Sequence, residues 1–207
     1  MTIARESLPL DGLGRRRLKI AFVGTHGVGK TTLCFDLAAQ LKRLDLGVEL
    51  VKEVVRRCPL PINEQTTADA QAWILHMQIA EELAAAASYE VVICDRSVLD
   101  NYAYLVKPMG RRPEMDALVD SWIRTYNALF RVPVIDAPSF DGTRAVSQSF
   151  QVEIDETIDD LVKAFGVDVT PLDPMDRDGW ITTVIQTLGL PTKAPQIDLF
   201  SLGASSR

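Results

Sequence analysis

Short apolar runs alternate with longer amphipathic stretches along most of the chain. Five runs have the length and composition of buried strands, over residues 18–23, 48–51, 91–94, 129–135 and 167–172. Apolar residues at helical spacing predict helices over residues 30–45, 70–88, 101–106, 115–126, 154–165 and 176–188. This alternation predicts an α/β fold: a doubly wound, mainly parallel five-stranded sheet with helices on both faces.

Two of these elements carry a more specific expectation. In the fourth strand, Pro133 lacks the N–H that a strand partner would use, so pairing is expected to weaken beyond the middle of the run. In the longest helix, one apolar stripe is expected to face the core, and it consists of Ala70, Trp73, Met77, Ala80 and Ala84.

The ordered pattern covers residues 18–190, which we expect to form one domain. Residues 1–17 are expected to be a flexible N-terminal segment, and residues 191–207 a loose C-terminal tail. The polar stretch 136–149 interrupts the domain between two apolar elements and contains Arg144. We expect it to form a lid loop.

Composition excludes several classes of function. The chain has 207 residues, of which 47% are hydrophobic and 24% charged, and these values rule out disorder along the whole chain. The net charge of −6 argues against a broad basic face for duplex nucleic acid. Three cysteines without zinc-binding spacing favour a reducing, cytoplasmic compartment. No run approaches the roughly 18 apolar residues of a membrane span, so no membrane partner is expected. A homodimer is compatible with the sequence.

The first predicted strand leads directly into a phosphate-binding motif. Residues 24–31 read Gly-Thr-His-Gly-Val-Gly-Lys-Thr and match the pattern G-x-x-x-x-G-K-[ST], in which backbone N–H groups and a helix N-terminus surround phosphate oxygens. We expect Lys30 to reach the β and γ phosphates of ATP and the Thr31 hydroxyl to bind Mg²⁺. The expected nucleotide-binding residues are Gly24, His26, Gly27, Val28, Gly29, Lys30, Thr31 and Thr32.

A second candidate group follows the most apolar strand, at Asp95 and Arg96. A carboxylate at this place can hold the Mg²⁺ ion of a bound nucleotide. Hydrolytic ATPases typically carry a glutamate next to this aspartate to polarise water, whereas an arginine can hold a phosphoryl group or a substrate oxygen. Ras-like GTPases carry an Asp-x-x-Gly pattern after this strand and an Asn-Lys-x-Asp pattern for guanine, and neither is present in this chain at those places. The alternative is a structural ion pair between Asp95 and Arg96.

These two motifs resemble the nucleoside and nucleotide kinases among P-loop proteins, which include deoxynucleoside kinases, thymidylate kinase and nicotinamide riboside kinases. Residues 58–67 (CPLPINEQTT) and 94–104 (CDRSVLDNYAY) further resemble small AAA-type ATP-binding proteins grouped with the kinase domain of the NAD-regulating protein NadR. The resemblance covers about residues 19–172. It implies the P-loop NTPase fold with ATP and Mg²⁺ as cofactors.

The resemblance also implies roles for individual residues. Glu53 stands at the place of the general base that acts on the acceptor hydroxyl, and Arg96 at the place of an arginine near the acceptor oxygen. The kinases carry a helical lid whose arginines close on the transferring phosphate. The lid of this chain has only Arg144, with Arg131 upstream on the fourth strand.

The sequence therefore predicts an ATP-dependent kinase of a small-molecule acceptor, a nucleoside or nucleotide-like compound. The predicted metal ligands are Thr31 and Asp95, and the predicted catalytic residues are Lys30, Glu53, Asp95, Arg96 and Arg144. Two alternatives stay open. Glu53 can instead be a solvent-facing carboxylate paired with Arg56 or Arg57. The whole chain can instead be a nucleotide-binding switch or regulatory ATPase module, which needs no acceptor cavity beside Asp95.

Overall fold

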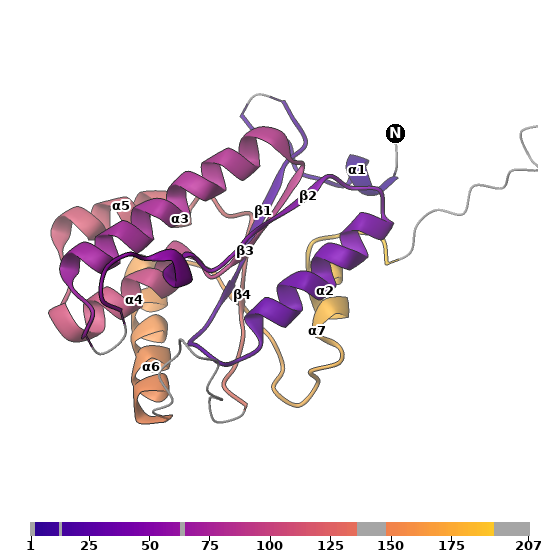
Figure 1. Cartoon of the computed structure of the whole chain (residues 1–207). Helices are drawn as coiled ribbons and strands as arrows, with labels where there is room; N and C mark the ends of the chain where they lie inside the picture. The colour runs from indigo at the N-terminus through magenta and orange to yellow at the C-terminus, as the bar shows by residue number, and fades with distance from the viewer. Residues whose placement is uncertain (1–2, 13, 63–64, 136–147, 193–207) are drawn as a thin grey trace, which may run out of the picture.

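A computed structural model of the chain describes residues 3–12, 14–62, 65–135 and 148–192. At its centre lies a five-stranded sheet of order β2-β3-β1-β4-β5 (Figure 1), in which every pair of neighbouring strands is parallel. The strands are β1 (Leu18–Val23), β2 (Val48–Val51), β3 (Val91–Asp95), β4 (Ala128–Arg131) and β5 (Thr170–Pro171). The predicted fold class is confirmed.

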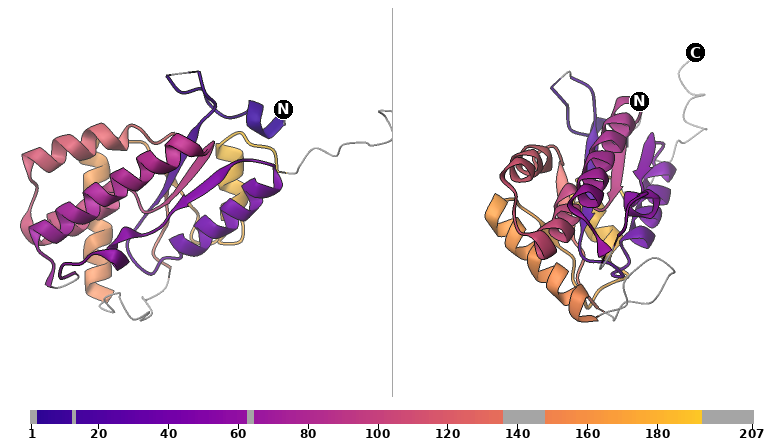
Figure 2. Two further views of the ribbon diagram at one scale, coloured as in Figure 1. Left: turned by 45° about the horizontal axis from the view of Figure 1, so that its top comes forward. Right: turned by 60° about the vertical axis from the view of Figure 1, so that its left-hand side comes forward.

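Helices cover both faces of the sheet (Figures 1 and 2). On one face lie α2 (Lys30–Arg43) and α7 (Trp180–Thr187). On the other face lie α3 (Ala68–Ser88), α4 (Val98–Met109), α5 (Pro113–Ile123) and α6 (Gln148–Phe165). A short helix, α1 (Ile3–Glu6), precedes the sheet, and a 3₁₀ turn, η1 (Val54–Arg57), follows β2. In the described part of the chain, no helix has the length and apolar content needed to cross a bilayer.

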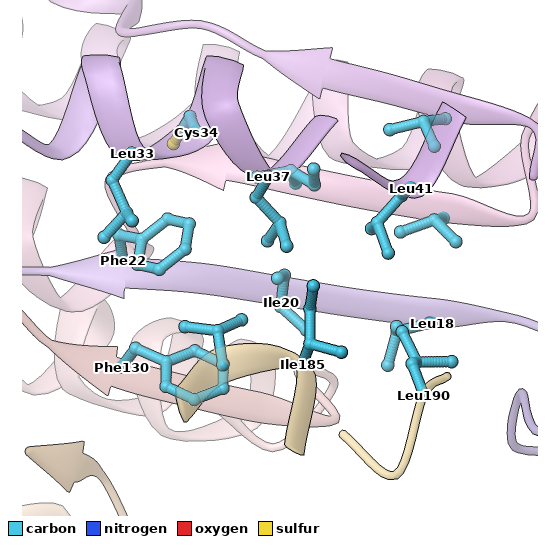
Figure 3. Close-up of a cluster of buried hydrophobic side chains, with 14 of the residues drawn as sticks. Leu18, Ile20, Phe22, Leu33, Cys34, Leu37, Leu41, Phe130, Ile185 and Leu190 are labelled. Atoms are coloured by element: carbon cyan, nitrogen blue, oxygen red, sulfur yellow. The ribbon is translucent and has the colours of Figure 1, made fainter. Parts of the chain in front are cut away.

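The two hydrophobic cores meet at the central strand β1. Ile20 and Phe22 pack into the cluster under α2 and α7 (Figure 3), while Ala21 and Val23 pack into the cluster under α3 to α6. Successive side chains of a strand point to opposite faces, so a strand buried on both faces is apolar throughout. This explains why the sequence shows strands as continuous apolar runs.

Several elements begin or end at other residues than the sequence predicts. β4 ends at Arg131, before Pro133, and β5 contains only two residues. Helix α4 starts at Val98 because the side chain of Ser97 caps it and accepts the N–H groups of Leu99 and Asp100. The hydrophobic spacing alone placed this start three residues later.

The prediction for the buried face of α3 was wrong. Among the five predicted residues only Ala70 is buried. The other buried residues of the helix are Gln71, Ile74, Leu75, Gln78, Glu82 and Ala85. Two of these side chains, Gln78 and Glu82, are polar and are completely buried. A search for apolar stripes does not count buried polar residues, so it assigned the face incorrectly.

The N-terminal segment also differs from the expected flexible one. It forms α1 and an isolated bridge between Leu10 and Arg16, and it buries Leu8 in the first cluster at 1% exposure. Residues 136–147 of the predicted lid, including Arg144, and residues 193–207 of the predicted tail lie outside the described residues.

Candidate active site

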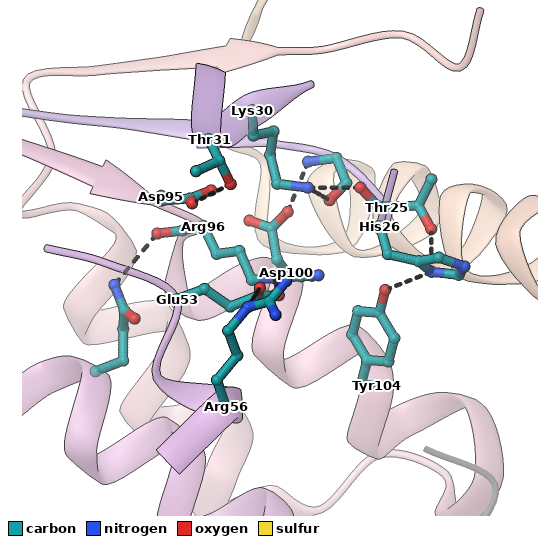
Figure 4. A network of polar contacts seen from close by, with 12 residues as sticks. Thr25, His26, Lys30, Thr31, Glu53, Arg56, Asp95, Arg96, Asp100 and Tyr104 are labelled. Atoms are coloured by element: carbon teal, nitrogen blue, oxygen red, sulfur yellow. Dashed lines mark hydrogen bonds and ion pairs between the residues drawn. The ribbon is translucent and has the colours of Figure 1, made fainter. Parts of the chain in front are cut away.

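The candidate site lies at the carboxyl ends of three adjacent strands. Gly24 follows β1, Glu53 follows β2 after one residue, and Asp95 ends β3, and these strands are neighbours in the order β2-β3-β1. The side chains that follow them meet above the sheet edge (Figure 4). Open parallel sheets bind ligands at this edge.

Glycine is required at two points of the phosphate loop. A side chain on Gly24 would bring its Cβ within 2.8 Å of the Val132 carbonyl oxygen, because the residue that follows β4 lies directly beside the loop. Gly29, the residue before α2, has a φ of 89°, which side chains disfavour. The loop therefore wraps tightly, and the N-terminus of α2 points into the space that the loop encloses. An anion is favoured there.

Lys30 points into the phosphate loop rather than into solvent. Its Nζ donates to the carbonyl oxygens of Gly24 at 2.6 Å and of Thr25 at 2.5 Å, and the residue is 5% exposed. Burial lowers the pKa of Lys30 to about 8. The ammonium group is thus held where the phosphates of a bound nucleotide would meet it.

Thr31 and Asp95 form the oxygen pair predicted for Mg²⁺. The Thr31 hydroxyl donates to Asp95 Oδ2 at 2.5 Å, across the gap between α2 and β3. No group of three or more His, Cys, Asp or Glu side chains that could hold a metal occurs within the described ranges. Mg²⁺ commonly binds one or two protein oxygens and completes its coordination shell with phosphate oxygens and water. The Thr31 hydroxyl and the Asp95 carboxylate are suitable protein ligands for such a site.

Glu53 and Arg96 form a buried ion pair beside the loop. Arg96 Nε donates to Glu53 Oε1 at 2.6 Å, and Arg56 Nε lies 3.4 Å from Glu53 Oε2. Glu53 is 9% and Arg96 5% exposed. Burial by itself would lower the pKa of Arg96, but Glu53, Tyr104 and Asp100 together outweigh it and hold that pKa well above its usual value, so Arg96 stays charged.

This geometry decides between two pairs of alternatives from the sequence. Glu53 is not a solvent-facing carboxylate, although Arg56 is indeed one of its partners. The hydrogen bond of Arg96 Nε goes to Glu53, so the interpretation of Asp95 and Arg96 as a plain ion pair with each other was wrong. Asp95 is instead bonded to the phosphate-loop side of the site.

Asp100 connects the two motifs, and the sequence analysis missed it. Its Oδ1 accepts the N–H of Gly24 at 2.6 Å, and its Oδ2 accepts the N–H and the hydroxyl of Ser97 at 2.8 and 2.7 Å. The residue is completely buried. The spacing Ser97-x-x-Asp100 is that of a capping box, and it was the signal available in the sequence.

The variable part of the phosphate loop is held from the α4 and α6 side. His26 Nδ1 lies 2.9 Å from the Tyr104 hydroxyl, and Gln151 Nε2 donates to the His26 carbonyl oxygen at 2.9 Å. The Tyr104 ring in turn lies 5.1 Å from the Arg96 guanidinium. These contacts hold His26 as a structural part of the loop.

Among the described residues, three small cavities adjoin along this edge. One of about 120 Å³ is bounded by the phosphate loop, Glu53, Asp95 and Arg96. A second of about 390 Å³ shares Thr31, Glu53 and Asp95 with it and extends toward η1. A third of about 200 Å³ shares Gly29 and Thr32 with the first and extends toward Trp180.

Two arginines differ in their availability near the site. Arg131, which precedes the lid, is paired with Asp155 and Asp159 of α6, at 2.9 Å in both cases. Arg177 is exposed, and its Nη2 would lie 2.9 Å from a Cβ on Gly29, at the mouth of the phosphate loop. The sequence analysis did not single out Arg177, because no motif contains it.

The comparison of this sequence with protein families agrees with the site. A family described as an AAA domain matches residues 19–178, from β1 through the loop that carries Arg177. The chain belongs to this AAA domain family. No curated protein matches the chain.

Solved structures with the same fold as this AAA domain protein include two kinases. Deoxyadenosine kinase from M. mycoides with bound dATP has a TM-score of 0.62 and 17% identity, covering 84% of this chain and 100% of its own. Thymidylate kinase from Ehrlichia chaffeensis has a TM-score of 0.61 and 20% identity, covering 83% of this chain and 98% of its own. The predicted P-loop nucleoside and nucleotide kinase-like fold is thereby confirmed. At these identities the likeness is one of fold.

Proposed function

We propose that this protein transfers the γ-phosphoryl group of ATP to the hydroxyl group of a small-molecule acceptor, a nucleoside or nucleotide-like compound. One observation carries the proposal: a buried glutamate, Glu53, lies beside the phosphate loop with its carboxylate fixed by Arg96. A switch or binding module has no need of a buried carboxylate at this place.

Phosphoryl transfer depends mainly on charge neutralisation and in-line placement. Lys30, the loop N–H groups and the N-terminus of α2 would neutralise the β and γ phosphates. Thr31 and Asp95 would hold Mg²⁺, which when bound would offset further negative charge on the phosphates. Arg96, and Arg144 if the lid closes, would contact the transferring group.

Glu53 would act as the general base. As the acceptor oxygen forms its bond to the γ phosphorus, the hydroxyl proton passes to the Glu53 carboxylate and the bond to ADP breaks. The ion pairs with Arg96 and Arg56 fix the position of the Glu53 carboxylate beside the phosphate loop.

The positions of the cavities support a separate place for each of the two substrates. The nucleoside part of ATP would lie in the cavity toward Trp180, and its phosphates in the cavity of the loop. The acceptor would approach Glu53 from the second cavity, which extends toward η1 and whose lining includes Lys52, Arg56 and Arg57. These cations favour an acceptor that carries a negative group, such as a nucleotide.

The three free cysteines, Cys34, Cys58 and Cys94, support the cytoplasmic location.

The test is a panel of nucleosides and nucleotides incubated with Mg²⁺ and ATP and scored for ADP release above the background without acceptor. With the best acceptor, Glu53→Gln is expected to lower kcat by roughly 10²–10⁴-fold while ATP affinity is kept. Glu49→Gln, on the strand that precedes Glu53 but away from the site, is the matched control and should keep full turnover.

The alternative, a nucleotide-dependent switch, makes the opposite forecast. If nucleotide binds tightly but no acceptor raises ADP release, the kinase proposal fails. If an acceptor is turned over and Glu53→Gln keeps the wild-type rate, the role of Glu53 fails while the kinase proposal stands.

A further inference from the structure

Glu82 is a buried carboxylate on α3, inside the hydrophobic cluster under α3 to α6 and away from the phosphate loop. It is completely buried, and each of its oxygens accepts two hydrogen bonds. Oε2 accepts from Lys19 Nζ at 3.0 Å and from Trp122 Nε1 at 2.7 Å. Oε1 accepts from Gln78 Nε2 at 2.9 Å and from the Tyr126 hydroxyl at 2.6 Å. A buried carboxylate that accepts four hydrogen bonds is held rigidly in the core.

Gln78 and Tyr126, the two side chains that donate to Oε1, also form hydrogen bonds with the turn that carries Arg96. Gln78 Nε2 also donates to the Arg96 carbonyl oxygen at 3.2 Å. The Tyr126 hydroxyl accepts the N–H of Val98 at 3.2 Å. The peptide groups on the two sides of Ser97 are therefore each linked to the same carboxylate oxygen by one side chain.

The chemistry of the partners fixes the direction of these links. Gln78 faces two acceptors, the Glu82 carboxylate and the Arg96 carbonyl, so its amide must present the NH₂ group to both. Tyr126 faces one acceptor and one donor, and a hydroxyl can serve both at once. Exchange of either side chain for an apolar one breaks the link to the turn.

The turn needs such support because Arg96 adopts a strained backbone. Its φ is 91°, in the left-handed region that a residue with a long side chain rarely occupies. Strained residues persist where their surroundings over-determine them. Asp100 holds the turn from the phosphate-loop side through Ser97, and Gln78 and Tyr126 hold it from the core side.

We infer that Glu82, acting through Gln78 and Tyr126, is the anchor that sets the position of the Arg96 guanidinium opposite Glu53. Gln78 and Tyr126 are positioning residues, since neither belongs to the cavity lining beside the phosphate loop. As far as turnover is concerned, the inference rests on the proposed kinase function. The position of Arg96 itself can be measured without an acceptor.

The experiment compares three variants that each remove a donor to Glu82. Gln78→Met and Tyr126→Phe break the two links to the turn, whereas Trp122→Phe removes a donor to Oε2 and leaves both links intact. The first readout is the ¹H–¹⁵N NMR signal of Arg96 Nε–H, assigned with Arg96→Lys, whose shift and slow exchange report the bond to Glu53. Nucleotide affinity is measured beside it.

The expected result is a shifted or fast-exchanging Arg96 signal in Gln78→Met and in Tyr126→Phe, an unchanged signal in Trp122→Phe, and wild-type nucleotide affinity in all three. With an acceptor in hand, kcat should fall by up to about 10²-fold in the first two variants at unchanged KM for ATP, because misplacement by about 1 Å has this effect.

An Arg96 signal that stays unchanged in the first two variants overturns the inference, and so does one that changes equally in Trp122→Phe. A displaced Arg96 with wild-type kcat overturns its importance for transfer. If the wild type has no acceptor, the proposed function fails, and the Arg96 signals still decide the positioning role. If Gln78→Met does not fold, the comparison of Tyr126→Phe with Trp122→Phe decides.

Discussion

Lys30 is the residue at which pH acts on the site most directly. Its pKa is lowered by burial from 10.5 to about 8, so the free protein loses the ammonium charge as the pH rises through 8. Bound phosphates favour the charged form. We therefore expect nucleotide affinity to be constant below pH 8 and to fall above it, approaching tenfold per pH unit. The unfolded chain keeps this proton up to about pH 10.5, so the free protein should gain stability over the same range.

Calorimetric titration with nucleotide at pH 7 to 9.5, in two buffers of different ionisation enthalpy, measures both the affinity and the proton uptake. Lys30→Arg is the control, because its charge does not titrate in this range. An affinity that stays flat to pH 9.5 in the wild type would show that the Lys30 proton is not coupled to phosphate binding.

Asp95 should matter for the metal rather than for the nucleotide alone. It faces Thr31 at 2.5 Å and makes an oxygen pair suited to Mg²⁺. We expect Asp95→Asn to remove most of the gain in ATP affinity that Mg²⁺ provides and to leave the affinity measured in EDTA unchanged. Equal losses with and without Mg²⁺ would identify Asp95 as a structural partner of Thr31.

At this scale the sequence predicted the residues whose spacing along the chain determines their chemistry. Lys30 and Thr31 belong to one eight-residue motif, and Asp95 ends a strand. The spacing of Asp100 from Ser97 indicates a helix cap but not the bond to Gly24, and no spacing indicates Gln78 or Glu82. Asp100 meets a partner 76 positions away, and Glu82 meets Lys19 at 63 positions. Only the fold brings such pairs together, and a polar residue in a helix looks solvent-exposed in the sequence.

At the scale of elements, the N-terminus of α4 joins the helix to the phosphate loop. Asp100→Asn replaces one acceptor oxygen by an NH₂ group that must face an N–H of Gly24 or of Ser97. We expect a loss of about 1–3 kcal/mol in the free energy of unfolding, because buried donors are left unsatisfied, together with weaker nucleotide binding. Denaturant titration and nucleotide affinity measure the two effects.

The matched control is the cap of another helix. Thr67 caps α3 by accepting the N–H of Ala70 and has no contact with the phosphate loop among its described bonds. Thr67→Ala should cost about 1 kcal/mol of stability and leave nucleotide affinity unchanged. If Asp100→Asn also leaves it unchanged, the link to Gly24 has no part in shaping the loop.

The sequence predicted the existence and type of the main elements better than their ends. All five predicted strands are present in the sheet, and β1 and β3, which are buried on both faces, are the apolar runs that such burial predicts. Their lengths depend on pairing, and β5 pairs only through Thr170 and Pro171. The start of α4 depends on a cap, and the buried face of α3 on polar partners, neither of which the apolar spacing contains.

At the scale of the whole molecule, the segment before β1 belongs to the folded domain. Leu8 is 1% exposed in the cluster that also contains residues of α2 and α7, whereas Leu10, two positions later, is 63% exposed. Arg16 ties the segment together by donating from Nη1 to the Leu8 carbonyl oxygen at 2.9 Å. These two leucines provide a matched pair for testing whether the segment stabilises the fold.

Leu8→Ala is expected to lower the free energy of unfolding by about 2–5 kcal/mol, as the loss of a buried leucine does. Leu10→Ala should change it by less than about 0.5 kcal/mol, because surface substitutions usually have small effects. Denaturant titration measures both effects if the slope of the free energy of unfolding against denaturant concentration stays the same. A change in that slope for Leu8→Ala would indicate a segment that detaches before the sheet unfolds. Equal, small effects of the two substitutions would mean that the segment is a loose extension and that the domain begins at β1. A large effect of Leu8→Ala alone would make the segment part of the core that supports α2, and hence part of the structure that holds the phosphate loop.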